Sequence, residues 1–231
     1  MLPRVLKRRD ESFARAFRSG ARESLDDVQM GLTLRYRIRT VGRLRFPTGW
    51  IVACDPFLRY DEPTPFTRKV KPGTYPVRLC FGEHPEGMVI AFAKVEFDSG
   101  SVEKWEMALR PGQDVEKLEG NQFFGYGVDS GTGCFADVDA MKAFARNLNE
   151  DYDNFSASAI KALNSGDGEK SQWANIQIDD GKKRDIAIFN SGAGDGAYAS
   201  YFGLTQRGRV LCLMTDFNIV PWHMAEYEDD E

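Results

Sequence analysis

The sequence predicts an α+β fold, mainly an antiparallel β sandwich or a strongly bent sheet, with a helical insert around residues 136–164. Short apolar runs of strand length recur along most of the 231 residues, and turns that contain glycine or proline separate them. One region changes to helical spacing. Hydrophobic residues make up 42% of the chain, which is enough to build a sizeable core.

The first thirty residues indicate a basic amphipathic helix. Phe13, Ala14, Phe17 and Ala21 recur at helical spacing, with arginines between them. Residues 1–45 hold twelve Lys or Arg and five Asp or Glu, a local charge of +7, so the remainder carries −12 of the total of −5. Such a basic segment suits nucleic acid or an acidic partner. The acidic total and the lack of a nucleic-acid-binding motif argue against nucleic acid.

The strands and helices follow from their spacing. In residues 32–40 apolar side chains alternate with Arg and Thr, which is typical of a strand with one buried face. Residues 98–101 are expected to form a hairpin turn. Helices are expected over 136–149 and 155–163, with Asp137 or Asp139 at the start of the first. The predicted strands are 32–40, 50–54, 75–81, 88–97, 102–109, 123–128, 173–178, 185–189, 201–204 and 209–215.

We divide the chain into a basic segment (1–30), a single mainly-β domain (31–222) and an acidic tail (223–231). No apolar stretch approaches 18 residues, and the basic start lacks the apolar region of a secretory signal, so we expect no membrane segment. Three of the four cysteines lie in apolar runs, and no CxxC pair occurs. We therefore expect a cytoplasmic protein with reduced thiols.

Two loops rich in glycine and aspartate, residues 125–137 and 190–198, form the candidate site. Glycine lets successive N–H groups point at an anion, although the same composition also serves tight turns. The spacing in 192–197 fits a dinucleotide fingerprint, but a strand-like segment follows where that fingerprint needs a helix. We expect the aromatic side chains of 198–201 to be exposed. The candidates for ligand or partner binding are Tyr126, Thr132, Ser191, Gly194, Tyr198 and Tyr201.

Carboxylates at strand ends are the candidate metal ligands: Asp129, Asp137, Asp195 and Asp216. If they converge, they could hold Mg²⁺ or Ca²⁺ or act as acid and base, although aspartate is also an ordinary turn residue. The candidate catalytic residues are Asp129, Cys134, Asp137 and Asp195. Cys134 lies beside a predicted helix start, where a thiolate is stabilised. The chain has only two histidines, which disfavours a Cys–His nucleophile.

Several motifs in order carry a resemblance to a known family. They are residues 49–56, 72–77, 125–137, 186–203 and 215–217. Together they resemble a bacterial family, the domain-of-unknown-function family 4241, over about residues 43–217. The resemblance implies a bacterial protein with a mainly β domain and no settled activity. Residues 186–203 are also similar to the aspartate- and glycine-containing hairpins of immunity proteins against bacterial toxins.

For function we expect a non-enzymatic intracellular binding module that recognises a protein partner, of the immunity or interbacterial-conflict type, and that needs no cofactor. The alternative is a divalent-cation-dependent hydrolase or phosphoesterase that uses the loop carboxylates with Mg²⁺ or Ca²⁺. Both ideas require the two loops to meet on one rim of the scaffold. An enzyme needs at least two carboxylates converging in a pocket, whereas a binding module needs a shallow exposed patch.

Overall fold

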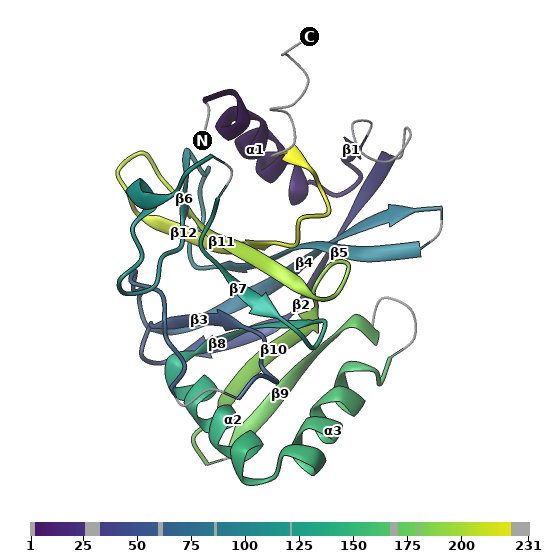
Figure 1. Ribbon diagram of the computed structural model, residues 1–231, viewed down its shortest axis with the longest axis vertical. Helices are drawn as coiled ribbons and strands as arrows, with labels where there is room; N and C mark the ends of the chain where they lie inside the picture. Colours follow the sequence, from purple (N-terminus) through teal and green to yellow (C-terminus); the bar gives the residue numbers. More distant parts are fainter. Residues whose placement is uncertain are drawn as a thin grey trace.

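The computed structural model describes residues 3–25, 33–59, 62–85, 87–120, 122–166, 171–179 and 181–222. Its elements form four layers, a helix, two sheets and a helix pair (Figure 1). Helix α1 (Pro3–Ala16) covers the outer face of the larger sheet, and α2 (Val138–Glu150) and α3 (Tyr152–Leu163) cover the outer face of the smaller one. The predicted α+β class and the helical insert are confirmed.

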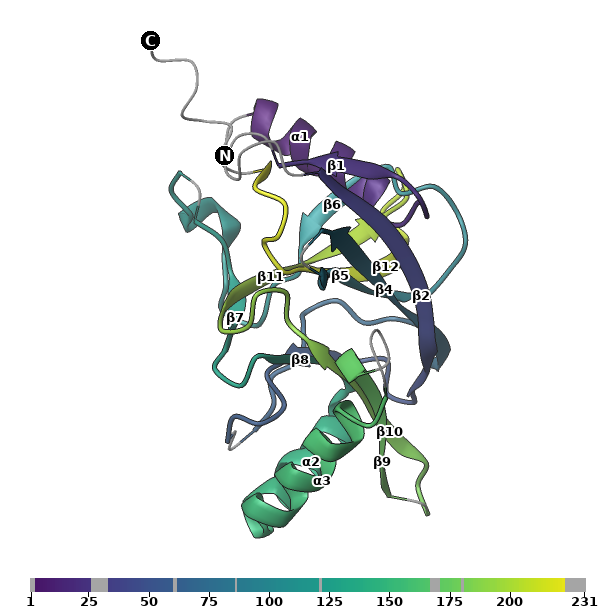
Figure 2. The same cartoon turned by 90° about the vertical axis from the view of Figure 1, so that its right-hand side faces the viewer.

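The larger sheet is antiparallel and strongly curved, as Figure 2 shows along β2. The long strands β2 and β4 shift register between Thr40 and Gly42, and such a bulge bends a strand. Gly42 has φ +154°, and the Asn175 amide lies against it and donates to the Val41 carbonyl at 2.9 Å. In sheet order the strands are β1 (Arg22–Ser24), β2 (Thr33–Phe46), β4 (Gly73–His84), β5 (Gly87–Glu96), β12 (Val210–Asp216), β11 (Gly196–Leu204) and β6 (Lys104–Met107), with β7 (Gly125–Val128) also paired to β11.

The smaller sheet separates two hydrophobic layers. Its strands, in order, are β3 (Ile51–Cys54), β8 (Thr132–Asp137), β10 (Arg184–Asn190) and β9 (Trp173–Asp179). Because side chains alternate along a strand, Phe135 and Phe189 point toward the larger sheet, while Cys134 and Ile188 point toward the helices.

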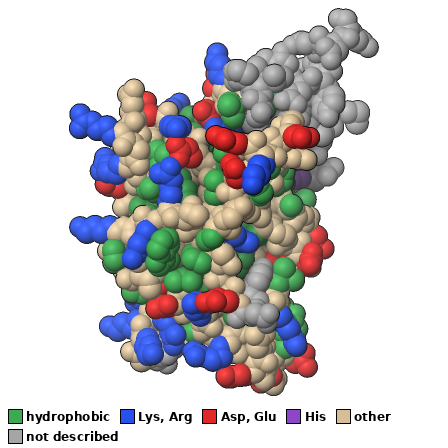
Figure 3. Space-filling model, turned by 60° about the vertical axis from the view of Figure 1, so that its left-hand side comes forward, with side chains coloured by type: hydrophobic (Ala, Val, Ile, Leu, Met, Phe, Trp, Pro, Cys, Tyr) green, Lys and Arg blue, Asp and Glu red, His purple; other side chains and the backbone are tan. Residues whose placement is uncertain are grey.

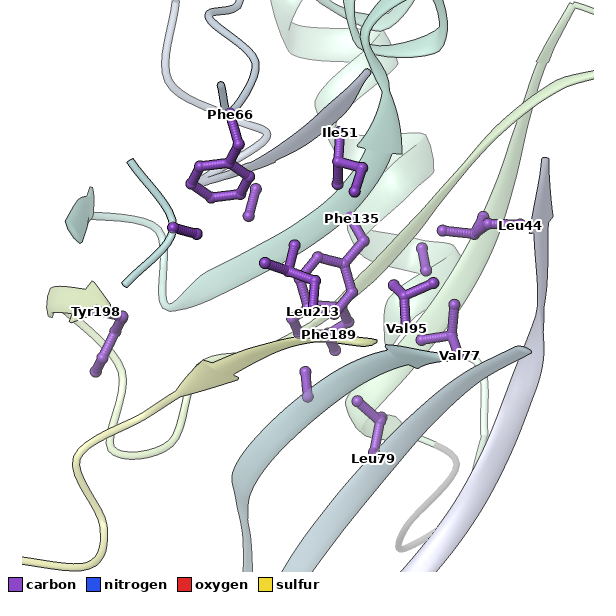
Figure 4. Close-up of a cluster of buried hydrophobic side chains, with 14 of the residues drawn as sticks. Leu44, Ile51, Phe66, Val77, Leu79, Val95, Phe135, Phe189, Tyr198 and Leu213 are labelled. Carbon is purple, nitrogen blue, oxygen red and sulfur yellow. The ribbon is translucent and has the colours of Figure 1, made fainter. Parts of the chain in front are cut away.

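The layer between the two sheets is the main core (Figure 4). The rings of Phe135 and Phe189 meet edge to face, with centroids 5.1 Å apart, and both are fully buried. Leu44 and Val77 reach the same layer from β2 and β4, and Leu213 reaches it from β12. The two sheets are therefore held together by side chains from early, middle and late parts of the chain.

A third layer lies beneath α1. The ring of Phe13 packs against Phe92, Trp105 and Trp222, with centroids 5.8, 5.2 and 6.0 Å apart. The predicted basic helix thus forms, although it ends at Ala16 rather than continuing to Ala21. Its apolar face is buried against the larger sheet. Among its basic residues Lys7 is exposed, Arg8 and Arg15 are half-buried, and Arg9 is buried over the rings of Phe13 and Tyr201. A short 3₁₀ turn, η1 (Val115–Lys117), lies in the segment between β6 and β7.

Several local predictions need correction. Residues 132–137 form strand β8, not a loop, and β11 begins at Gly196 instead of residue 201. The hairpin expected at 98–101 is wrong, because β5 pairs with β4 and β12 while β6 pairs with β11. The alternation in 32–40 predicts four buried side chains. Leu34 and Tyr36 are buried, Ile38 is half-buried, and Leu32 lies outside the described residues. No helix in the described ranges is long and apolar enough to cross a membrane.

Candidate partner-binding site

The two glycine-rich loops meet side by side. Strand β7 pairs with the first half of β11, with Val128 opposite Gly196, so the turn after β7 adjoins the turn before β11. The Gly131 N–H donates to Asp195 Oδ1 at 3.1 Å, and the Ser191 N–H donates to the Gly131 carbonyl at 3.0 Å. Loops about sixty residues apart therefore share one rim of the scaffold.

A buried carboxylate, Asp55, holds the first loop. The residue is 0% exposed and follows β3 directly. Its Oδ2 accepts the N–H groups of Asp129 and Ser130 at 3.0 and 2.9 Å. Its Oδ1 accepts the Ser130 hydroxyl at 2.7 Å and the Phe57 N–H at 2.9 Å. Sequence reasoning missed this residue, and its only signal was its position within the family-like motif of residues 49–56.

The second loop is closed by its own hydrogen bonds. The Gly194 N–H donates to the Ser191 carbonyl at 2.8 Å, and the Ser191 hydroxyl donates to the Gly194 carbonyl at 2.9 Å. The Tyr198 hydroxyl donates to the same Gly194 carbonyl at 2.8 Å. Gly192 has φ +55°, and a Cβ there would lie 2.8 Å from Phe217 Cβ, so only glycine fits. The loop is thus a fixed turn.

The exposed surface of the two loops differs from the predicted one. Tyr198 and Tyr201 are 4% and 1% exposed, so the expectation of an exposed aromatic group is wrong. Tyr126, Thr132 and Ser191 are also buried, and only Gly194 is partly exposed. The reason is that strand aromatics fill the core: Tyr126 and Tyr198 pack between the two sheets, and Tyr201 packs beneath α1. Apart from Gly125, at the start of β7, the exposed residues are Gly127, Asp129, Ser130, Ala193, Asp195, Gly196 and Ala197, and we name these seven the rim.

The four candidate carboxylates do not come together. Asp129 and Asp195 belong to the rim, but Asp137 lies at the far end of β8, about 16 Å along the strand from Thr132. Its Oδ2 accepts the N–H and hydroxyl of Thr48 at 3.0 and 2.7 Å, and its Oδ1 caps α2 through the Asp139 N–H. Burial raises the pKa of Asp137 above its usual value.

Asp216 is buried in another layer. Its Oδ2 accepts the indole N–H of Trp222 at 2.6 Å, and its Oδ1 accepts the Asn218 N–H at 2.9 Å. Burial raises its pKa to about 6, while these two hydrogen bonds act in the opposite direction. In the part of the chain that the structure describes, no three His, Cys, Asp or Glu side chains are grouped so that they could hold a metal ion.

Comparison of the chain with known protein families gives one match. The family described as a protein of unknown function (DUF4241) matches residues 44–215. The chain belongs to this family. The matched DUF4241 region contains Asp55, both loops, the strands from β3 to β11 and all of β12 except Asp216, whereas α1 and β1 precede it. No curated protein and no solved structure matches the chain.

Cys134, within the DUF4241 region, is not placed as a nucleophile. It lies in β8 with 0% exposure, three residues before the residue that caps α2. Burial, the largest cause, and the contact with Cys54 raise the pKa of its thiol well above the usual value. A protonated, enclosed thiol does not suit the role predicted from a nearby helix start. Cys54, Cys80 and Cys212 are likewise buried and free.

Two open hollows are lined by residues of neither loop. One of about 480 Å³ lies between Glu62 and α2, where Lys142 and Arg146 line it. The other, of about 550 Å³, lies between α1 and β1 and includes Arg15 and Glu23, which pair at 2.7 Å. Figure 3 shows one face on which hydrophobic side chains gather midway, with Lys and Arg side chains above and below them. The rim residues include two carboxylates, Asp129 and Asp195, and no Lys or Arg.

Proposed function

We propose that the chain is a non-enzymatic binding module that recognises a protein partner through the rim. The observation that carries this proposal is the composition of the exposed surface where the loops meet. It consists of glycine, alanine and serine with two carboxylates, Asp129 and Asp195. Small side chains let a partner approach the backbone closely, and two acids favour a partner surface that carries Lys or Arg.

The hydrogen bonds behind the rim support the same proposal. Asp55 fixes the first loop, the Tyr198 hydroxyl fixes the second, and the Gly131–Asp195 bond joins them. A surface that is already ordered loses little entropy when it binds, so a modest area can still give a specific complex. The partner class that fits the sequence is a protein toxin. The chain would then act in the cytoplasm as the immunity-type protein that neutralises this toxin.

The proposal is also consistent with the structural roles of the candidate aspartates. Asp137 caps a helix and Asp216 accepts from Trp222, so neither adjoins the rim pair. Asp195 accepts a backbone N–H, which is the ordinary role of aspartate in a turn. A hydrolase would need at least two of these groups in one pocket.

Cross-linking in the host cell followed by mass spectrometry tests the proposal. Two arginine variants are compared, Ala197→Arg on the rim and Ala157→Arg on the exposed face of α3, and the captured partner is then purified and titrated. We expect cross-links near the rim and an affinity at least about tenfold weaker for Ala197→Arg only, since an inserted bulky side chain blocks contact. Equal binding by both variants, or Mg²⁺-dependent phosphoester turnover lost in Asp129→Asn, would overturn it.

A further inference from the structure

Three sulfur atoms form a triangle in the layer between the smaller sheet and α2. Cys54 and Cys134 are direct partners in the pairing of β3 with β8, and their Sγ atoms are 3.6 Å apart. Met141 comes from α2, and its Sδ lies 3.8 Å from Cys54 Sγ and 4.0 Å from Cys134 Sγ. Three different elements thus bring two thiols and one thioether to one point.

The size of this triangle matches a three-coordinate metal–sulfur site. A metal–sulfur bond is about 2.3 Å long, so three sulfurs in a plane around one ion lie about 4.0 Å from one another. The observed separations of 3.6, 3.8 and 4.0 Å need only small movements to reach that spacing. The three sulfurs already share one centre without a change of strand register.

The type of ligand selects the ion. Thiolate together with thioether is a soft ligand set, which prefers Cu(I) to the harder divalent cations. Zinc takes four ligands, from Cys, His, Asp or Glu, so a Cys₂Met set does not suit it. The three sulfurs belong to a buried cluster that includes the apolar side chains of Val52, Ala136 and Ile188. Such a shell keeps out water, in which free Cu(I) disproportionates to Cu(II) and metallic copper.

We propose that Cys54, Cys134 and Met141 form a binding site for one Cu(I) ion. When Cu(I) binds, each of the two thiols loses its proton to solvent and both sulfurs bind the cation. No electron is transferred. Until then burial favours the protonated thiol of Cys134. Because β3 is an edge strand and Cys54 is its last residue, the site lies at the border of the sheet, where 3% of Cys54 is exposed.

The test titrates the whole chain, reduced and without oxygen, with Cu(I) in competition with the chromophoric chelator bathocuproine disulfonate. The wild type is expected to retain one equivalent, and X-ray absorption is expected to show sulfur neighbours at about 2.3 Å. Cys54→Ala and Cys134→Ala are expected to lose the ion. The control Cys212→Ala, a buried cysteine of the other sheet, is expected to keep it.

Met141→Leu keeps the test decisive if a cysteine variant fails to fold. This swap conserves volume and is among the best tolerated in a core, so circular dichroism should show an intact fold. Loss of the thioether is expected to weaken Cu(I) binding by at least about 10- to 100-fold, the range for a lost outer-shell group. A folded wild type that retains no Cu(I), or cysteine variants that retain it equally well, would show that the three sulfurs merely pack together.

Discussion

Ser130 and Asp55, 75 positions apart in the chain, are joined by two hydrogen bonds. The Ser130 N–H donates to Asp55 Oδ2 at 2.9 Å, and its hydroxyl donates to Oδ1 at 2.7 Å. Because Asp55 is completely buried, its carboxylate must be satisfied by donors of this kind. The position of the rim is therefore set by the end of β3, in a different part of the chain.

Replacing Asp55 by alanine should destabilise the protein. The change removes the acceptor of four hydrogen bonds, and each donor left without a partner costs about 1–3 kcal/mol. We expect Asp55→Ala to lower the free energy of unfolding by at least about 3 kcal/mol, measured by urea denaturation. Asp129→Ala, exposed in the same loop, should change it by less than about 0.5 kcal/mol. Similar losses in both variants would contradict this role.

Two glycines near the rim should respond differently to alanine. At Gly192, with φ +55°, a new Cβ would meet Phe217 Cβ at 2.8 Å and its carbonyl oxygen at 2.9 Å. At Gly127 nothing lies within 4 Å of a new Cβ. Backbone strain and overlap together should cost Gly192→Ala about 2–4 kcal/mol, while Gly127→Ala should be neutral or slightly stabilising. Thermal unfolding measures both, and equal melting temperatures would refute the assigned strain.

Asp216 should make stability fall as pH rises. Its pKa is raised from 3.8 to about 6, so the folded state holds a proton that the unfolded state has lost between these values. This contribution is complete below pH 4 and disappears as pH rises through about 6, a change of about 3 kcal/mol.

Comparing wild type with Asp216→Asn isolates this effect, since the other titrating groups are common to both. We expect the stability difference between them to shift in favour of the variant from pH 4 to pH 7. Denaturant unfolding at several pH values provides the measurement. Parallel profiles for the two proteins would mean that Asp216 does not titrate in this range.

The layer between the sheets should be the most sensitive part of the core. Phe135 is fully buried there and contacts Phe189. Phe135→Ala should cost about 3–5 kcal/mol, through lost burial and the cavity that remains. Phe123→Ala, at a ring that is 36% exposed, should cost much less in the same denaturation experiment. A small loss at Phe135 would show that the two sheets do not depend on this layer.

The local spacing of apolar residues predicted those helices and strands that have one face exposed to solvent. Strand β2 alternates between buried and exposed side chains, and α2 has apolar residues at helical spacing, capped by Asp137 as expected. Strand β8 was missed because all six residues are buried, so it shows no alternation. Gly133 suggested a loop, yet its missing side chain makes room for the Tyr126 hydroxyl and the Phe189 ring, which lie 2.9 and 3.1 Å from the point where a Cβ would be.

Contacts between distant segments could not be read from local spacing. Turn residues at 98–101 suggested a hairpin, but the neighbour of β5 is β12, more than a hundred residues later. The tyrosines near the loops carried no sign of which face they occupy, and Asp55 resembled an ordinary residue after a strand. From the sequence we expect the two loops to meet, and they do. The residues that hold them in place, such as Asp55, could be identified only in the structure.

Helix α1 precedes every strand, yet the aromatic side chains beneath it come from the middle and the late part of the sequence. Phe13 rests on Phe92 and also on Tyr201 and Trp222, which follow it by more than 180 residues. During synthesis the helix can complete these contacts only after Trp222 has been made. Replacing Trp222, which follows the last strand and belongs to the layer beneath α1, should therefore loosen the helix while the core between the two sheets is kept.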